Sequence, residues 1–455
     1  MLNTPFAPWP SFSAEEIHAV QVVLASNKVN YWTGQECRLF EQEFAQWVGV
    51  PHAVSLANGT LALDLALKVL GVGPGDEVVV TPRTFIASVS SIVNAGATPV
   101  FADVELDSGN ISARTIAQVI TPKTKAIVCV HLAGWPCDLY PIMALAEKHS
   151  LYVIEDCAQA HGAQYKGRSV GSIGHIGAWS FCQDKIMTTG GEGGMVTTHD
   201  ETLWRKMWAY KDHGKSYEAV YERDHPPGYR WLHESFGTNW RMLEIQAAIG
   251  RIQLRNMPKW VAKRHLNAQI LTDALLPFTG DKGPLRLPQI GCLSGCGSEG
   301  CESRGCGSSE AVATQLNSVP QHITKIARSQ TQFENAANLK YACPLGCIHA
   351  FYKFYFYIKP EFINDGWSRD RIIQEMNQAG VPCYSGSCSE VYLEKAFDDN
   401  GLRPHTRMQN AQALGETSIM FLVHPTLTQD QIQKTIETFL DLIAIACHTS
   451  QTSMI

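Results

Sequence analysis

The 455-residue sequence lacks the features that mark membrane, secreted and nucleic-acid-binding proteins. It contains no uncharged apolar run of about 18 residues, so we expect no membrane-spanning helix. Its beginning has no basic stretch followed by an apolar core, which argues against a signal peptide and favours a cytoplasmic protein. The net charge of −6 gives no sign of a nucleic acid partner.

The composition is that of a large globular enzyme. Hydrophobic residues make up 45% of the chain and charged residues 18%, a balance that allows a chain of this length to bury a substantial core. We expect two domains around one site. Residues 1–255 are predicted to form the larger domain, and residues 256–455 a smaller C-terminal α/β domain.

Short β-prone segments alternate with helical stretches in the first part of the chain. The predicted strands cover residues 53–56, 78–82, 98–104, 126–130 and 151–154. Helices are predicted over residues 14–25, with Ser13 as the N-cap, over 37–48 and over 61–70. Strand, helix and strand in this repeat favour right-handed crossovers and a mostly parallel sheet, which is an α/β fold.

Residues 177–196 contain a lysine in an unusual setting. An apolar run ends in a polar turn that carries Lys185, and a glycine-rich segment then leads into a second apolar run. Glycines let the backbone pass close to another group or adopt positive φ. A partly desolvated lysine in such a loop has a lowered pKa and can act as a nucleophilic amine. Taken alone, the same pattern also fits a solvated surface lysine in a hairpin.

A pair of carboxylates lies upstream of this loop. The β-prone run of residues 151–154 ends in Glu155 and Asp156, which places a carboxylate at the carboxyl end of a buried strand. In open α/β sheets that edge is where ligands bind. Pyridoxal phosphate needs an amine to bond to and a carboxylate that keeps its ring nitrogen protonated. Lys185 and Asp156 together therefore predict a site for this cofactor.

Two segments resemble the DegT/StrS family of sugar aminotransferases. They are residues 155–162, with the sequence EDCAQAHG, and residues 180–194, which include Lys185. The resemblance runs from about residue 8 to about residue 443. It implies a fold-type I pyridoxal phosphate enzyme whose mostly parallel sheet is flanked by helices. One relative, a sugar dehydratase, has histidine in place of the cofactor-binding lysine, so Lys185 favours transamination.

The resemblance implies a role for each of eight residues. Lys185 is the catalytic amine, Asp156 holds the pyridine nitrogen, and Phe85 packs on the pyridine face. Gln159 and Ser180 form hydrogen bonds near the ring hydroxyl and the phosphate. The phosphate is bound by Gly59 and Thr60 at a helix start, and by Asn239 from the partner subunit. Some of these residues also have structural interpretations. Thr60 could cap its helix, Phe85 could belong to the core, and Asn239 could be the N-cap of the next helix.

The implied reaction converts a keto sugar attached to a nucleotide into an amino sugar, with glutamate as the donor. The product would enter polysaccharide or glycan synthesis. The resemblance also implies a homodimer with shared active sites and no metal. Two alternatives remain open, which are a pyridoxal phosphate-dependent dehydratase and a non-catalytic homologue that only binds the cofactor.

The resemblance is interrupted by an insert of low complexity at about residues 289–347. The insert is rich in Gly, Ser and Cys, and its cysteines are Cys292, Cys296, Cys301, Cys306, Cys343 and Cys347. Their spacing lacks the usual C-x₂-C pairs of zinc sites, so a solvated loop is favoured over a metal site. The family pattern resumes with a predicted strand over residues 348–356. Residues 212–234 are predicted to form a long loop.

Overall fold

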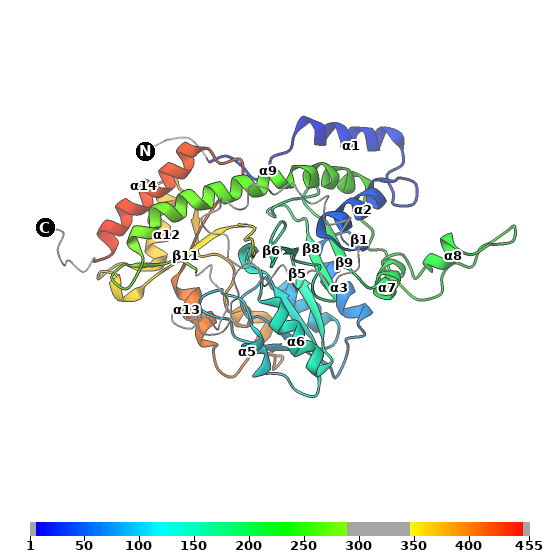
Figure 1. Ribbon diagram of the computed structural model, residues 1–455, viewed down its shortest axis with the longest axis horizontal. Coiled ribbons are helices and arrows are strands. Elements are labelled where there is room, and N and C mark those ends of the chain that lie inside the picture. Colours follow the sequence, from blue (N-terminus) through cyan, green and yellow to red (C-terminus); the bar gives the residue numbers. More distant parts are fainter. Residues whose placement is uncertain (1–5, 289–345, 449–455) are drawn as a thin grey trace, which may run out of the picture.

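The computed structural model describes residues 6–288 and 346–448 of the chain. A long helix, α9 (Glu244–Leu275), crosses above two separate sheets in Figure 1. It packs against α1 (Ala14–Ser26) and α2 (Glu36–Val48), and also against α14 (Gln429–Ala446). The predicted boundary after residue 255 falls inside this helix, and the division into residues 1–255 and 256–455 stays a prediction.

The larger sheet has seven strands in the order β1-β9-β8-β5-β4-β2-β3. They are β1 (His52–Leu56), β2 (Glu77–Val80), β3 (Thr98–Phe101), β4 (Thr124–Val130), β5 (Tyr152–Asp156), β8 (Ile176–Ser180) and β9 (Gly194–Thr198). The neighbours from β3 to β8 are parallel, and β9 alone runs antiparallel to both of its neighbours. The mostly parallel sheet predicted from the sequence is therefore confirmed.

Alternate residues of these strands enter separate layers of the core. Val78 and Val80 of β2 belong to a cluster that includes α3 (Gly59–Val69), α4 (Ala87–Asn94) and α7 (Glu201–Lys211). Val79, between them, belongs to a cluster with α5 (Ala113–Ala117) and α6 (Leu139–His149). Because successive side chains of a strand point to opposite faces, helices cover both faces of the sheet.

The smaller sheet has four antiparallel strands in the order β10-β11-β13-β12. Its strands are β10 (Leu285–Arg286), β11 (Phe354–Ile358), β12 (Cys383–Tyr384) and β13 (Ser418–Phe421). One hydrophobic cluster joins this sheet to α14, to α12 (Arg369–Gln378) and to the second half of α9. The helix α13 (Gln409–Thr417) precedes β13 directly.

Some of the predicted elements differ from the structure. The strand expected over residues 348–356 begins only at Phe354, because its first residues form a loop that is hydrogen-bonded to Gln164 and Gly134. The long loop at 212–234 contains a short helix, α8 (Tyr217–Tyr221), which Ser216 caps. A small hairpin, β6 (Gln164–Tyr165) and β7 (Arg168–Ser169), was not anticipated.

Within residues 6–288 and 346–448, no helix has both the length and the apolar character needed to cross a membrane. Residues 289–345 of the predicted insert, which include all its cysteines except Cys347, lie outside the described residues. Cys347 itself is buried.

Candidate active site

A cavity of about 510 Å³ lies between the two sheets. One wall is formed by loops that follow the carboxyl ends of β2, β5 and β8, and it includes Phe85, Gln159 and Lys185. The opposite wall comes from the smaller sheet, with Tyr355 and Tyr384 among its residues. The structure thus brings together three residues that the sequence predicts for one site, at the sheet edge where ligands are expected.

Lys185 lies in the loop between β8 and β9. Its side chain is 16% exposed, and its Nζ is 3.7 Å from Oδ1 of Asp184. The same Nζ is 5.3 Å from the ring centre of Tyr352, whose hydroxyl donates to the other oxygen of Asp184. The indole N–H of Trp9 donates to the backbone carbonyl of Lys185 over 2.8 Å. The hydrogen bond from Trp9 therefore fixes the backbone of Lys185, and Asp184 and Tyr352 determine the direction of its side chain.

Asp184 is held as a carboxylate beside this lysine. Burial would raise the pKa of Asp184, but the positive charge of Lys185 and the hydrogen bond from Tyr352 outweigh burial and lower it. Asp184, Tyr352 and Trp9 were not identified from the sequence. Only the position of Asp184 next to Lys185 could have pointed to it, because the other two residues are distant in the chain.

Asp156 ends β5 and is 6% exposed. Its Oδ2 accepts a hydrogen bond from Ser88 Oγ over 2.7 Å, and its Oδ1 accepts one from the backbone N–H of Ala158 over 3.1 Å. The Ser88 hydroxyl is also 2.8 Å from that of Thr84, which lines the cavity. This fixed, buried carboxylate lies at the strand end where the sequence placed it.

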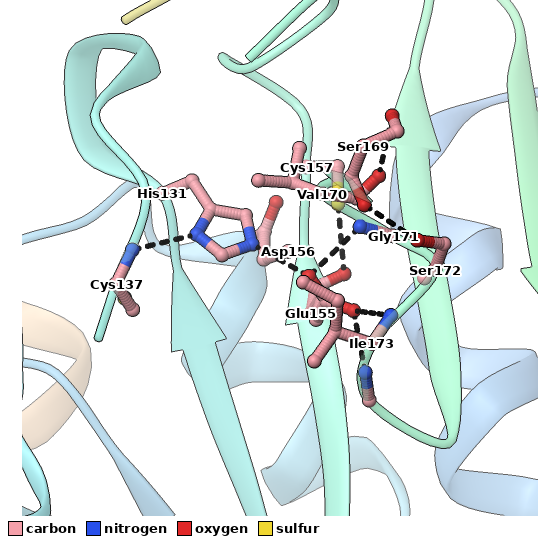
Figure 2. Close-up of polar contacts among 12 residues, drawn as sticks. His131, Cys137, Glu155, Asp156, Cys157, Ser169, Val170, Gly171, Ser172 and Ile173 are labelled. Atoms are coloured by element: carbon pink, nitrogen blue, oxygen red, sulfur yellow. Dashed lines mark hydrogen bonds and ion pairs between the residues drawn. The ribbon is translucent and has the colours of Figure 1, made fainter. Parts of the chain in front are cut away.

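Glu155, the neighbour of Asp156, serves the fold on the other face of β5. Figure 2 shows its carboxylate held by His131 and by the loop at residues 171–174. Nε2 of His131 is 3.0 Å from Oε2, and backbone N–H groups of Gly171, Ile173 and Gly174 donate over 2.8, 2.8 and 2.6 Å.

These bonds determine the charge of Glu155. Burial would raise its pKa, but the hydrogen bond from His131, together with the backbone N–H bonds, lowers it. The backbone N–H of Cys137 donates to Nδ1 of His131 over 3.0 Å, so the imidazole carries its proton on Nε2 and donates to Glu155. This arrangement anchors the 171–174 loop to β5 and, through the backbone, steadies Asp156.

The ligand atoms of His131, Glu155 and Cys157 lie within 4.8 Å of one another, and all three side chains are buried. His131 and Glu155 are bonded to each other, and both oxygens of Glu155 accept backbone hydrogen bonds as well. The hydrogen bonds thus account for this cluster as a structural one.

Gly59 and Thr60 form the first turn of α3. The N-cap is Asn58, whose side chain accepts from the backbone N–H of Leu61 over 3.0 Å. The interpretation of Thr60 as the cap is therefore wrong, and the helix begins two residues earlier than predicted. A Cβ placed on Gly59 would lie 2.5 Å from Cβ of Ser180. Ser180 is buried at the end of β8, so Gly59 and Thr60 at the start of α3 lie against this strand end, outside the described lining of the cavity.

Phe85 and Gln159, the two other predicted site residues that line the cavity, differ in exposure. Phe85 is 66% exposed and lines the cavity, so the interpretation as a core residue is wrong. Gln159 is buried, and its Oε1 accepts from the backbone N–H of Ala133 over 2.8 Å. The amide NH₂ group is consequently the part of Gln159 that can act on a ligand.

Asn239 is exposed and lies outside the cavity lining. It pairs with Asp212 in an isolated β-bridge. Because Leu243 is the N-cap of α9, the interpretation of Asn239 as that cap is wrong. Its predicted contact with the site of a partner subunit stays a prediction.

This geometry has counterparts in known proteins. The sequence pattern of the DegT/DnrJ/EryC1/StrS aminotransferase family matches residues 10–285. The chain belongs to this family. The family membership confirms the resemblance found in the sequence and the enzyme class, a sugar aminotransferase.

Individual family members agree over much of the chain. The X-ray structure of the aminotransferase from Psychrobacter cryohalolentis is 59% identical, covers 97% of this chain and 100% of its own, and has a TM-score of 0.84. This match confirms the fold-type I α/β architecture.

Two relatives that match over shorter segments have named activities. GDP-perosamine synthase of Escherichia coli O157:H7 is 42% identical over 261 residues, 57% of this chain and 68% of that protein. UDP-N-acetyl-3-dehydro-alpha-D-glucosamine 3-aminotransferase of Acidithiobacillus ferrooxidans is 46% identical over 224 residues, 49% of this chain and 58% of that protein.

Proposed function

We propose that this family member is a pyridoxal phosphate-dependent aminotransferase that converts a nucleotide-linked keto sugar into an amino sugar, with glutamate as the donor. The observation that carries the proposal is the placement of Lys185. Its amine enters a cavity that Phe85 and Gln159 also line, at the edge of the sheet where Asp156 ends β5.

The residues at this edge fit pyridoxal phosphate. Only glycine fits at position 59, because a Cβ there would collide with Ser180. The first turn of α3 presents unpaired N–H groups and the positive end of the helix dipole, as a phosphate requires. The buried carboxylate of Asp156 suits a protonated ring nitrogen, and the exposed ring of Phe85 suits a stacked aromatic face. This cofactor, when bound, supplies an electron sink for the substrate carbon.

Lys185 performs the proton transfer in this proposal. Its Nζ is the amine that would move a proton between the substrate carbon and the cofactor. Asp184 lies 3.7 Å from the amine and orients it, and Tyr352 keeps Asp184 in place. Trp9 fixes the backbone at Lys185. The amine therefore stays near one position while its protonation changes.

We infer that two copies of the chain share each active site. The segment that leads to Asn239 projects away from the rest of the molecule at the right of Figure 1. It exposes Trp231 by 81% and Phe236 by 100%, and exposed aromatic side chains of this size mark interaction surfaces. A second copy would cover them and receive Asn239 at its phosphate site. We also expect the dimer to be cytoplasmic.

The substrate class rests on the names of the relatives. One is a GDP-perosamine synthase and another is a UDP-N-acetyl-3-dehydro-alpha-D-glucosamine 3-aminotransferase, so a keto sugar linked to a nucleotide is the shared chemistry. The nucleotide differs between these proteins, and the proposal therefore specifies the class alone.

The test is an assay of the purified protein with glutamate and a panel of keto sugars linked to GDP, UDP or dTDP. Formation of 2-oxoglutarate together with an aminated sugar, both absent for Lys185→Ala, supports the proposal. A sugar that loses water without gaining nitrogen indicates the dehydratase. Cofactor binding without any reaction indicates a non-catalytic homologue.

A further inference from the structure

Lys353 is a second lysine in the wall of the catalytic cavity. It lies next to Tyr352, in the segment that leads into β11. Its Nζ is 4.9 Å from the ring centre of Tyr352, and Nζ of Lys185 is 5.3 Å from the same ring centre. The two amines therefore lie beside one aromatic ring.

Lys353 and Lys185 are the basic side chains in the described lining of this cavity, and Asp184 and Glu394 are the acidic ones. Asp184 is already engaged by Lys185 and by Tyr352. Within residues 6–288 and 346–448, no carboxylate forms an ion pair with Lys353. Since Lys185 bonds to the cofactor in the proposed function, Lys353 remains as the cation that an incoming substrate can meet.

Several charged or titratable groups face Lys353. Burial lowers its pKa to about 8; the negative charge of Asp184 opposes this shift, while the positive charges of Arg264 on α9 and of Lys185 add to it. His424, after β13, also feels the charge of Lys353. A half-buried amine surrounded by more positive than negative charge is stabilised by an anion from outside.

We propose that Lys353 binds a carboxylate of the amino donor while the donor's amine reacts beside Lys185. This inference rests on the proposed function. An amino acid donor carries a carboxylate on the carbon that bears its amine, and glutamate carries a second one. A cation beside the reacting lysine holds that carboxylate and orients the amine. Once the keto acid leaves, the same cation is free for the next donor.

An acidic group on the sugar substrate has the same chemistry as a donor carboxylate. The half-reaction with the donor alone distinguishes these two possible ligands of Lys353, because it proceeds without the sugar. In that half-reaction the cofactor's visible absorption falls as the donor delivers its amino group, and its dependence on donor concentration gives the apparent donor affinity.

The experiment compares wild type with Lys353→Met and Lys353→Arg in this half-reaction with glutamate, glutamine and alanine. We expect Lys353→Met to weaken the apparent glutamate affinity about 10- to 100-fold, as for loss of a hydrogen bond to a charged group, and Lys353→Arg to stay within a few-fold. Equal losses for all donors identify the α-carboxylate, and a loss confined to glutamate identifies the side-chain carboxylate.

The control is Lys68→Met, which removes a lysine whose Nζ lies 5.7 Å from a tyrosine ring far from the cavity. It should leave the donor affinity unchanged. The apparent affinity of wild type for glutamate should weaken as the pH rises through about 8, where Lys353 loses its proton. Lys353→Arg should retain its affinity to higher pH.

Unchanged donor affinity in a folded, cofactor-loaded Lys353→Met protein overturns the inference, as does an effect confined to the KM of the sugar. In both cases the proposed function stands, because wild type still reacts with the donor. If wild type reacts with no donor at all, the proposed function itself fails. Thermal melts of the variants verify that each one is folded.

Discussion

The hydroxyl of Ser88 donates to Oδ2 of Asp156 over 2.7 Å, and both side chains are buried. Ser88 belongs to α4, which begins directly behind the loop that carries Phe85. The bond therefore couples the end of β5 to the loop after β2, two parts of the site that are far apart in the sequence. Such a bond fixes the direction of the Asp156 carboxylate.

Removing the Ser88 hydroxyl should weaken cofactor binding. Loss of a hydrogen bond to a charged group costs about 1.5–3 kcal/mol, so we expect Ser88→Ala to lower the affinity for pyridoxal phosphate by roughly 10-fold or more.

Asp156→Asn should reduce kcat by on the order of 10²–10³-fold, as for loss of a key electrostatic partner.

Fluorescence or absorbance titration with the cofactor measures the affinity of Ser88→Ala, and a steady-state assay measures the kcat of Asp156→Asn. The matched control is Ser90→Ala on the same helix, whose hydroxyl makes a long 3.5 Å contact with the carbonyl of Ala87. Equal losses for Ser88→Ala and Ser90→Ala would contradict a specific role for Ser88.

Gly59→Ala should damage the phosphate corner of the site. The new Cβ would lie 2.5 Å from Cβ of Ser180, and overpacking of this kind costs about 1–3 kcal/mol. We expect a lower melting temperature and a larger loss of cofactor affinity, because α3 must shift at the turn that would hold the phosphate. Gly73→Ala serves as the control, since the nearest atom to its Cβ would be 3.9 Å away.

Glu155 should contribute stability that depends on pH. Its folded-state pKa is lowered, so its contribution is fully present above the ordinary glutamate value of about 4.3 and is lost as the pH falls toward the folded-state value. We expect Glu155→Gln to be destabilised by about 1.5–3 kcal/mol at pH 7, as for loss of a hydrogen bond to a charged group.

Urea denaturation of both proteins between pH 7 and the acid limit of folding tests this prediction. The difference in unfolding free energy between wild type and Glu155→Gln should shrink on acidification. A difference that stays constant would show that the carboxylate charge is not the source of the effect.

Trp9→Phe should loosen the loop that carries Lys185. The phenyl ring keeps the packing against Trp260 but loses the bond to the Lys185 carbonyl, which is worth about 0.5–1.5 kcal/mol. We expect a modest loss of stability and a several-fold lower kcat. Trp204→Phe loses a similar bond, to the carbonyl of Ala53 at 3.3 Å, and should affect stability without affecting kcat.

The elements that the sequence revealed best are those with a local signal. The N-cap predicted at Ser13 is present, and Ser13 forms a capping box with Glu16. Helix α1 (Ala14–Ser26) also ends within one residue of its predicted bound. The strands of the parallel sheet are short buried apolar runs, so they too were predicted. The start of β11 was predicted too early because residues 348–353 are equally β-prone, but they form hydrogen bonds to Gln164, Gly134 and Ala133 instead.

The site itself was only partly visible in the sequence. Lys185, Phe85 and Gln159 line one cavity, and the cofactor roles that the resemblance implies for them stay predictions. Trp9 and Tyr352 reach the lysine loop from distant parts of the chain, and no local pattern records such contacts. Asn239 was assigned to a partner's site, and that placement depends on a second copy of the chain.

The central claim is that Lys185 is the amine that bonds to the cofactor and carries out transamination. The most direct test is the visible spectrum of purified wild type and Lys185→Ala with pyridoxal phosphate, before and after glutamate. We expect wild type to show a band near roughly 420 nm, the general wavelength for this cofactor bonded to a lysine, that fades with glutamate, and Lys185→Ala to lack it. A Lys185→Ala protein that forms the same band and responds to glutamate in the same way would contradict the account.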